Sequence, residues 1–452
     1  MHLLEIRGKN YLLDCGLFQG RRSEAHDRNK NFPFNPASIS AVVLSHAHAD
    51  HAANLPNLVR QGFRGPIYAT PATRDLCNVM LFDSAYIQER DIEFVNRRRM
   101  KRGELPFKPL YSAGDVIQTM SQFVSVDYRR PFDVGEGVYA SFADAGHILG
   151  SAVVRLELEE MNKKIRLGFT GDLGRRNTPI LKDPEPMEPV DLLISESTYG
   201  GRIHEPIVGA KDRLLDVILK TANRHGKVIV PAFSLGRTQE LLYILFELFE
   251  EHRLPPIPIY VDSPLAVNAT EVFRLHPECF DEETMRYLHL HEDPFGFGKV
   301  RYVRSIEDSK RINQTREACI VISASGMCEA GRVLHHLANA VEDSRNTILV
   351  VGFQAEHTLG RKLVERQPEV NILGDVFKLK AEIAVLNALS AHAGQDELAL
   401  YAAQLNNASQ LKNIFLVHGE LVQQQSLAEV LKSQGMQHIN IPARSDTFEM
   451  NE

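Results

Sequence analysis

Cysteine is scarce in this sequence and is not arranged to bind metal or to form a disulfide framework. The five cysteines are odd in number and form no Cys-x-x-Cys pair: Cys15, Cys77, Cys279, Cys319 and Cys328. This pattern argues against a disulfide-stapled secreted domain and against a zinc site built from thiolates. It is typical of a protein that works in a reducing compartment.

Long apolar segments are also missing. No apolar run approaches the roughly 20 residues that a membrane-spanning helix needs. The first residues, Met1 to Glu5, contain neither a basic region nor the apolar core of a signal peptide. We therefore expect a cytoplasmic protein without a membrane partner.

Positive charge and phosphate-binding loops are in short supply as well. The net charge of the 452 residues is −7, so no overall electrostatic field attracts nucleic acid, and any polyanion site must be local. The basic run 97–102 is a candidate for such a local polyanion site, although runs of this kind are usually solvated helix faces. Neither a Gly-x-Gly-x-x-Gly motif nor a Walker motif occurs, so we expect no nucleotide cofactor.

A cluster of metal-ligating side chains follows the short apolar run 41–44. His46, His48, Asp50 and His51 lie within six positions. Each group would need a partner once buried, and zinc takes imidazole and carboxylate as ligands. His46 and His48 can point the same way from an extended backbone and share one metal, while Asp50 and His51 can reach a second. A solvated histidine-rich loop is the alternative interpretation.

Further polar residues stand at the ends of strand-like segments along the chain. They are Asp14, His147, Asp172, Glu196, His392 and His418. Taken alone, most have an ordinary structural explanation as a turn aspartate, a helix-cap neighbour or a structural histidine. Taken together with the segment 45–51, they predict one constellation.

The length predicts two domains, because a single core rarely grows this large. Beyond about residue 205, strands alternate with helices, which predicts a mostly parallel sheet. Ligands bind such sheets at the carboxyl ends of the strands, where helix N-termini present N–H groups to anions. The candidate phosphate-binding residues there are Ser234, Arg237, Ser325, Gly326, Arg332, Thr358 and Arg361. Arginine suits phosphate because it forms bidentate hydrogen bonds, and helix capping is the alternative role.

Over nearly the whole chain, these motifs resemble the metallo-β-lactamase superfamily and, within it, the nucleic-acid-processing β-CASP branch. The resemblance implies an α/β fold: a metallo-β-lactamase αββα sandwich from residues 1–204 and 371–452, with a parallel-sheet β-CASP domain inserted at 205–370. Relatives usually begin with an additional strand and a Gly/Thr/Ser-rich loop. By this resemblance, either the start of the sequence is misassigned or the first sheet lacks its edge strand here.

The resemblance implies a site for two zinc ions. The first set of ligands is His46, His48, His147 and Asp172, and the second is Asp50, His51, Asp172 and His418, so that Asp172 bridges the metals. Asp14 would orient the site from beneath. Glu196, His392 and His418 match the motifs A, B and C of the β-CASP branch.

The implied function is a zinc-dependent ribonuclease, similar to bacterial or archaeal relatives of the pre-mRNA 3′-end-processing endonuclease subunit. A hydroxide bridging two metals would hydrolyse the RNA phosphodiester bond and leave a 5′-phosphate and a 3′-hydroxyl, in RNA processing or decay. The catalytic residues would be Asp50, Asp172, Glu196 and His392. His392 would give a proton to the leaving oxygen and Glu196 would orient it. Histidine at motif C favours single-stranded RNA over DNA as the substrate.

Other readings stay open on the sequence alone. One is a different binuclear hydrolase of the superfamily, acting on DNA or on a small ester, thioester or lactam. Another is a non-catalytic RNA-binding partner. Within the ribonuclease reading, endonuclease and 5′→3′ exonuclease modes both fit, and a homodimer is compatible with the sequence.

Overall fold

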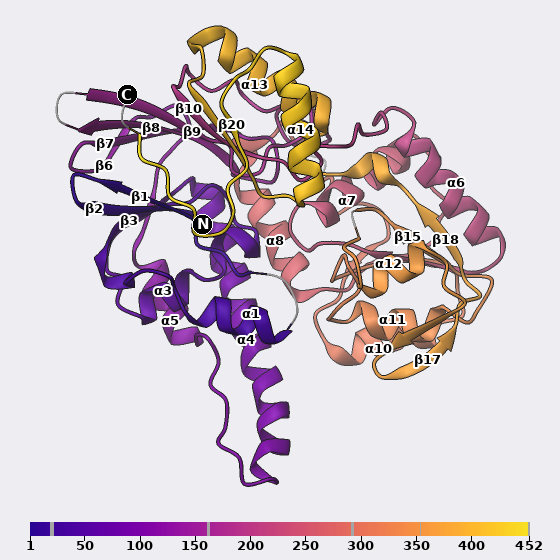
Figure 1. The fold of residues 1–452 in the computed structure, drawn as a ribbon. Helices are drawn as coiled ribbons and strands as arrows, with labels where there is room; N and C mark the ends of the chain where they lie inside the picture. The colour runs from indigo at the N-terminus through magenta and orange to yellow at the C-terminus, as the bar shows by residue number, and fades with distance from the viewer. Residues whose placement is uncertain (19–21, 161–162, 291–292, 353, 451–452) are drawn as a thin grey trace. The chain divides into compact units, whose positions relative to one another are not determined.

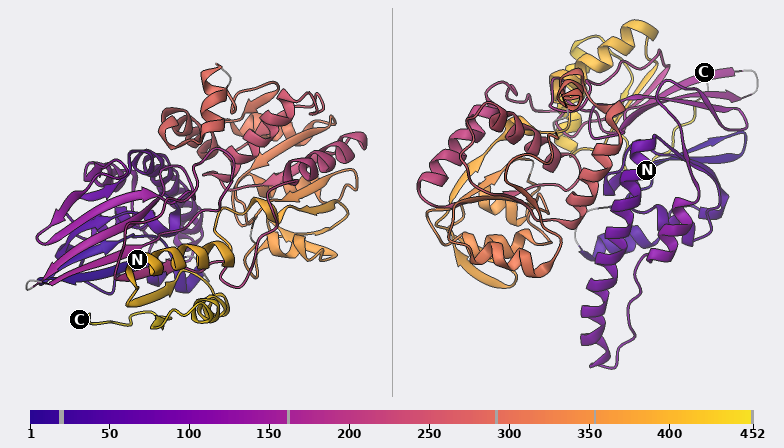
Figure 2. Two further views of the ribbon diagram at one scale, coloured as in Figure 1. Left: turned by 90° about the horizontal axis from the view of Figure 1, so that it is seen from above. Right: turned by 180° about the vertical axis from the view of Figure 1, so that it is seen from behind.

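A computed structural model describes the chain except for residues 19–21, 161–162, 291–292, 353 and 451–452. The described residues form two compact units, which differ in colour in Figures 1 and 2. The first unit contains residues 1–176, 183–203 and 392–452, and the second contains 177–182 and 204–391. The second unit continues to residue 391 because β18 (Glu382–Val385) joins its sheet, and the domain bounds given from the sequence, with the insertion at 205–370, stay a prediction.

The first sheet of the first unit carries the histidine-rich segment. Its strands pair in the order β1 (His2–Ile6), β2 (Lys9–Leu13), β3 (Ile39–Val43), β4 (Ile67–Ala69) and β5 (Phe123–Ser125). β1 and β2 form an antiparallel hairpin, and β2 to β5 run parallel. The helical segments along this part of the chain are α1 (Arg22–Lys30), a 3-10 turn at Pro36–Ser38, α2 (Ala49–Ala52), α3 (Leu55–Arg60), α4 (Pro71–Met100) and α5 (Ala113–Met120).

The second sheet supplies most of the other strand ends. Its strands pair in the order β20 (Ile439–Asn440), β19 (Asn413–Val417), β10 (Leu192–Glu196), β9 (Lys163–Phe169), β8 (Ala152–Glu160), β7 (Val138–Asp144) and β6 (Phe132–Gly135). β9, β10 and β19 are parallel to one another, so their carboxyl ends lie at the same edge. Apolar side chains from both sheets, such as Leu13, Val43, Phe142 and Phe169, form one shared core.

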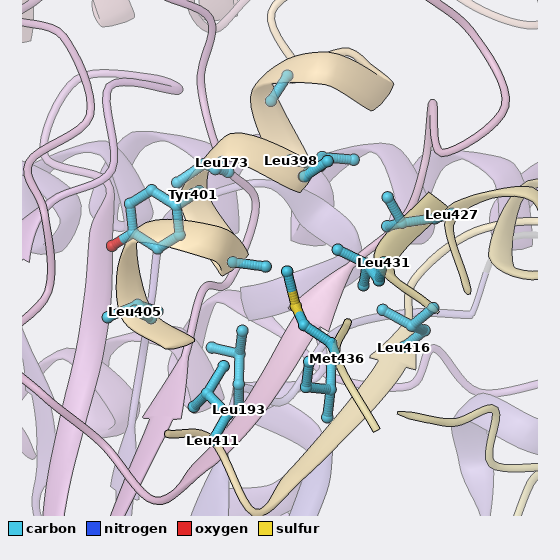
Figure 3. Close-up of a cluster of buried hydrophobic side chains, with 14 of the residues drawn as sticks. Leu173, Leu193, Leu398, Tyr401, Leu405, Leu411, Leu416, Leu427, Leu431 and Met436 are labelled. Atoms are coloured by element: carbon cyan, nitrogen blue, oxygen red, sulfur yellow. The ribbon is translucent and has the colours of Figure 1, made fainter. Parts of the chain in front are cut away.

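Helices cover the outer faces of these two sheets. α13 (Gln395–Ser409) and α14 (Leu421–Ser433) pack on the second sheet, where Leu398 and Leu427 meet Leu193 and Leu416 (Figure 3). α3, α4 and α5 pack against one another on the side of the first sheet. This arrangement confirms the predicted αββα sandwich. Among the described residues, no helix combines the length and the apolar character that crossing a membrane requires.

The second unit is an α/β domain with a parallel sheet, as predicted from the alternating strands and helices. Its strands pair in the order β13 (Val300–Tyr302), β12 (Ile259–Val261), β14 (Cys319–Ser323), β11 (Lys227–Pro231), β15 (Thr347–Val350) and β18, and all neighbours are parallel. The helices are α6 (Ala210–Asn223), α7 (Arg237–Glu250), α8 (Pro264–Leu275), α9 (Glu282–His289), α10 (Ile306–Gln314), α11 (Val333–Ala340) and α12 (Leu359–Val364). An antiparallel hairpin of β16 (Glu369–Ile372) and β17 (Asp375–Lys378) and short 3-10 turns at Pro277–Cys279 and Asn387–Leu389 complete it.

Candidate active site

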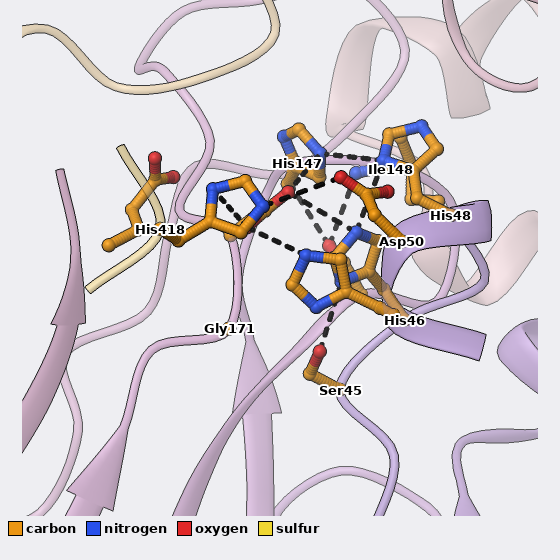
Figure 4. Close-up of polar contacts among 12 residues, drawn as sticks. Ser45, His46, His48, Asp50, His147, Ile148, Gly171 and His418 are labelled. Carbon is orange, nitrogen blue, oxygen red and sulfur yellow. Dashed lines mark hydrogen bonds and ion pairs between the residues drawn. The ribbon is translucent and has the colours of Figure 1, made fainter. Parts of the chain in front are cut away.

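The polar residues singled out in the first unit meet at the carboxyl ends of strands from both sheets. His46 and His48 follow β3, His147 follows β7, Asp172 follows β9, Glu196 ends β10, and His418 follows β19. Parallel strands present their carboxyl ends at a common edge, so residues far apart in the sequence come together there. Figure 4 shows several of them pointing toward one another.

Three histidines and one carboxylate form the first group of potential metal ligands. His48 Nδ1 lies 3.1 Å from both His46 Nε2 and His147 Nε2. Asp172 Oδ2 lies 3.4 Å from His46 Nε2 and 3.5 Å from His147 Nε2. The ligand atoms of these four residues all lie within 4.8 Å of one another, which suits a single ion.

A second group uses the other oxygen of Asp172. His51 Nε2 lies 3.2 Å from Asp172 Oδ1, and His418 Nε2 lies 3.4 Å from Asp50 Oδ2. Asp50, His51 and His418 form a set of atoms within 4.8 Å, and Asp172 joins His418 and Glu196 in another. The two oxygens of Asp172 therefore face the two groups, as a bridging carboxylate would.

Asp14 organises this site from within the core. Its Oδ1 accepts a hydrogen bond from the backbone N–H of Ser45 at 2.7 Å, and its Oδ2 accepts one from Ser45 Oγ at 2.8 Å. Oδ2 also lies 2.6 Å from His51 Nδ1. A carboxylate can only accept, so we assign the proton of neutral His51 to Nδ1, which leaves a lone pair on Nε2.

That lone pair provides a test of whether the residues fit a metal ion. In the described part of the chain, His51 Nε2 and Asp172 Oδ1 are buried and have no hydrogen-bond partner. They face each other at 3.2 Å, and in this tautomer both are acceptors. Buried polar atoms are rarely left without partners, and two facing acceptors are satisfied together by a cation. The donor set of nitrogen and oxygen atoms fits zinc.

Burial and neighbouring charges shift the pKa values of the histidines in opposite directions. Burial lowers the pKa of His48 to about 3 and holds the pKa values of His46 and His147 below their usual range. Neutral imidazole is the form that binds a metal. Burial would also lower the pKa of His51, but the carboxylates of Asp172 and Asp14 outweigh it and raise that pKa, so His51 has to lose its Nε2 proton before that atom binds a metal.

His392 and Glu196 form a separate pair beside the ligand cluster. His392 Nδ1 lies 3.3 and 3.2 Å from the two carboxylate oxygens of Glu196, and 3.9 Å from Asp172 Oδ2. Glu196 is fully buried and also accepts the backbone N–H of Leu173 at 2.5 Å. Burial works against protonation of His392, but Glu196 and Asp172 outweigh it and raise its pKa to about 9.

The backbone of the site is held in conformations and contacts that leave little room for change. Asp14 and His418 adopt left-handed φ values of 59° and 48°, which non-glycine residues rarely do. A Cβ on Gly174 would lie 1.8 Å from the carbonyl oxygen of Gly146, and one on Gly16 would lie 1.6 Å from that of Asp50. Such outliers concentrate at functional sites, where surrounding contacts hold them.

Two hydroxyl residues of the site were not predicted from the sequence. Ser45 binds Asp14 and lies 3.0 Å from His46 Nδ1, so it connects the two. Thr198 Oγ1 lies 3.1 Å from His418 Nδ1, which leaves Nε2 facing Asp50. Both residues stand one or two positions from a recognised motif residue, and this adjacency is the feature of the sequence that could have predicted them.

The arginines predicted to bind phosphate are already engaged within the second unit. Arg332 donates to the buried carboxylate of Asp262 at 2.6 Å and to the carbonyl oxygens of Val303 and Arg304. Arg237 is buried and pairs with Glu240, while Arg361 is more exposed and pairs with Glu365 at 2.6 Å. The contacts of Arg332 favour a structural role because they compensate a buried charge.

The smaller residues at these strand ends also have structural partners. Ser234 Oγ lies 3.0 Å from Ser263 Oγ, and Ser325 Oγ accepts the backbone N–H of Glu329. The carbonyl of Gly326 accepts Gln354 Nε2, and Thr358 caps α12. Capping and turn formation therefore account for these contacts, and phosphate binding by this group stays a prediction.

Comparison with known families agrees with this architecture. The family model described as metallo-beta-lactamase superfamily matches residues 1–109, and the model described as Beta-Casp domain matches residues 238–363. A third model, described as Zn-dependent metallo-hydrolase RNA specificity domain, matches residues 377–442. The fold and the histidine–aspartate cluster thus define a protein of the metal-dependent hydrolase class.

Individual relatives extend over most of the chain. Ribonuclease TTHA0252 of Thermus thermophilus is 35% identical over 436 residues, which are 96% of this chain and 94% of the relative. Transcription termination factor FttA of Methanosarcina mazei is 28% identical over 92% of this chain, and that of Pyrococcus abyssi is 31% identical over 84%. The chain spans 64% and 57% of the length of these two factors. The protein belongs to the β-CASP family of the metallo-β-lactamase superfamily.

Proposed function

We propose that this protein is a zinc-dependent ribonuclease that hydrolyses phosphodiester bonds of single-stranded RNA and leaves a 5′-phosphate and a 3′-hydroxyl. One observation carries the proposal: two sets of ligand atoms converge on the two oxygens of Asp172, next to the His392–Glu196 pair. The name of the Thermus thermophilus relative and the RNA specificity domain support RNA as the substrate.

The two ligand sets support the assignment of two zinc ions. His46, His48, His147 and Asp172 would hold one, and Asp50, His51, His418 and Asp172 would hold the other. When bound, a zinc pair supplies a Lewis acid that lowers the pKa of a water toward about 7 and neutralises charge on the phosphate. Asp14 and Ser45 keep His51 and His46 in place for this task.

His392 is assigned as the proton donor to the leaving oxygen. Its Nδ1 is occupied by Glu196, so the proton that it gives away is on Nε2. A water loses one proton to solvent and its oxygen forms a bond to phosphorus, while the bond from phosphorus to the 3′-oxygen breaks and that oxygen takes the proton of His392. Glu196 holds the imidazole in the orientation and tautomer that this transfer needs.

The test is cleavage of end-labelled RNA that carries either a 5′-hydroxyl or a 5′-monophosphate. We expect the zinc-loaded protein to cleave RNA, and Asp172→Ala to lose both activity and bound zinc. His392→Ala should keep its zinc but lose most activity, whereas His289→Ala, an exposed histidine of α9, should behave like the wild type. Uncleaved RNA in the presence of bound zinc would contradict the proposal.

The products would also separate the remaining alternatives. Internal fragments from both RNAs would indicate an endonuclease, and mononucleotides from the monophosphate form alone would indicate a 5′→3′ exonuclease. Cleavage of DNA, esters or thioesters instead of RNA would assign the site to another reaction of the superfamily. RNA binding without hydrolysis would indicate a non-catalytic partner. The cytoplasmic location and the homodimer stay predictions.

A further inference from the structure

The basic run noted in the sequence lies at the end of a long projection. α4 and the segment that returns from it extend away from the body of the first unit (Figures 1 and 2). Residues 96–108, which we call the arm tip, form its outer end. They include six basic residues and one acidic residue, a net charge of +5 in a chain whose net charge is −7.

The arm tip has a defined structure that presents these charges to solvent. Asn96 binds both backbone polar groups of Phe107, at 2.9 and 2.8 Å, and so joins the returning segment to the helix. Arg99 donates to the carbonyl of Leu105 at 2.8 Å and stacks over the ring of Phe107 at 4.0 Å. These contacts fasten the tip without using the other cations.

Most of the basic side chains of the arm tip are exposed and available. Arg97, Lys101, Arg102 and Lys108 are exposed, and within the described residues they make no ion pair. Phe107 is 46% exposed beside them, with Arg99 over its ring and the ring of His26 6.2 Å away, so part of the ring stays open to a base. The remaining part of α4, residues 71–95, is net acidic, so positive charge is concentrated at the outer end.

This combination of cations and an aromatic ring fits a single-stranded nucleic acid. Cations follow the phosphate backbone, and an aromatic ring accepts a base of any kind by stacking. A protein partner would need an apolar patch, but the three exposed apolar side chains of the tip, Met100, Leu105 and Phe107, lie among the charges. Charge complementarity therefore favours RNA.

The geometry of α4 gives the distance between the arm tip and the candidate active site. The helix begins against the loop that carries His147, because Thr70 and Thr73 both donate to the carbonyl of Gly150, at 2.6 and 2.7 Å. Its 30 residues span about 45 Å at ~1.5 Å each. A stacked strand with about 3.4 Å per nucleotide covers that length in about 13 nucleotides.

We propose that the arm tip is a second binding site for the backbone of single-stranded RNA, outside the active site. The inference rests on the proposed function, because it assumes the same RNA substrate. It predicts that long RNAs bind more tightly than short ones, and that only the long ones depend on the arm tip.

The experiment neutralises three exposed cations of the tip in the full-length protein, as Arg97→Gln, Lys101→Gln and Arg102→Gln together. The control neutralises Lys9, Lys412 and Lys432, three exposed lysines elsewhere on the same unit, in the same way. Binding of a labelled RNA of about 30 nucleotides is measured by fluorescence anisotropy over a series of salt concentrations, with a chelator to stop cleavage. Cleavage of this RNA and of one of about six nucleotides is measured with zinc.

We expect the arm variant to bind the long RNA roughly tenfold or more weakly, with a slope of log affinity against log salt that is shallower by about 2. Cleavage of the short RNA should not change, nor should any property of the control. A separate Phe107→Ala variant should weaken binding about fivefold with an unchanged slope, because stacking involves no counterion release.

The outcomes separate this inference from the proposed function. Cleavage of the long RNA together with unchanged affinity and slope in the arm variant would overturn the arm-tip site and leave the ribonuclease. Arm-dependent binding without cleavage would support the arm-tip site and count against the ribonuclease. A wild-type protein that binds no RNA would overturn both.

Discussion

Replacing Asp14 by asparagine tests how the candidate metal centre is organised. The asparagine side chain has the same shape, and asparagine tolerates the left-handed φ of 59° at this position. Its oxygen can accept the backbone N–H of Ser45 as before. Its NH₂ group, however, must stand where Asp14 Oδ2 meets His51 Nδ1. It would donate to Nδ1 and so move the proton of His51 to Nε2.

The displaced proton would point at the place where a metal ligand is needed. His51 Nε2–H would lie 3.2 Å from Asp172 Oδ1 and could donate to it. In the metal-free protein the variant loses the charged hydrogen bonds that Asp14 Oδ2 makes with Ser45 Oγ and His51 Nδ1, each worth about 1.5–3 kcal/mol, so the Tm should fall by several degrees. Zinc affinity of the second ligand set should fall by about 10–100-fold, the usual effect of losing such a supporting contact.

The assay is zinc titration against a chelating indicator, together with thermal unfolding of the metal-free protein. The control is Asp115→Asn on α5, because Asp115 also accepts the N–H and Oγ of a serine, both at 2.8 Å, but has no histidine partner. We expect the two ligand sets to bind zinc with clearly different affinities in Asp14→Asn and with similar affinities in the control. Two tightly bound zinc ions in Asp14→Asn would refute the assigned tautomer and the role of Asp14.

Three other predictions concern packing, buried charge and metal removal. Gly174→Ala should abolish RNA cleavage, because its Cβ would overlap the Gly146 carbonyl beside His147, whereas Gly352→Ala, which has open space, should be active. Arg332→Met should destabilise the second unit by about 3 kcal/mol in urea unfolding at neutral pH, because it leaves the Asp262 carboxylate with only His336 and Ser309. Burial raises the pKa of Asp262, but hydrogen bonds from His336, Ser309 and Arg332 outweigh burial and lower it. The difference in the free energy of unfolding between the wild type and Arg332→Met should therefore persist at pH values above the ordinary aspartate pKa. It should vanish as the pH falls through the lowered pKa of Asp262, which urea unfolding in acid would check. Zinc at a hundred times its Kd should stabilise the wild type by about 2.7 kcal/mol per site, and calorimetry should find little such gain in Asp172→Ala.

The two units differ in how well their functional residues could be predicted from the sequence. The ligand types and their positions after strands were readable because histidine and aspartate stand at short, regular spacings from apolar runs, as in the segment 45–51. The arginines of the second unit were less readable. Their positions at strand ends were visible, but the partners Asp262, Glu240 and Glu365 depend on the packing of helices against the sheet.

The sequence by itself determined the chemical inventory, which follows from residue type, and the alternation of strands and helices beyond about residue 205, which follows from periodicity; the αββα sandwich was implied by the resemblance to a known superfamily. Only the tertiary structure decided that His51 Nδ1 faces Asp14, that Glu196 holds His392, and that the basic run stands at the end of a projection. The physical reason is that hydrogen bonds and electrostatic contacts act over a few ångströms. Glu196 and His392 are 196 positions apart in the chain, and only folding brings them within 3.2 Å.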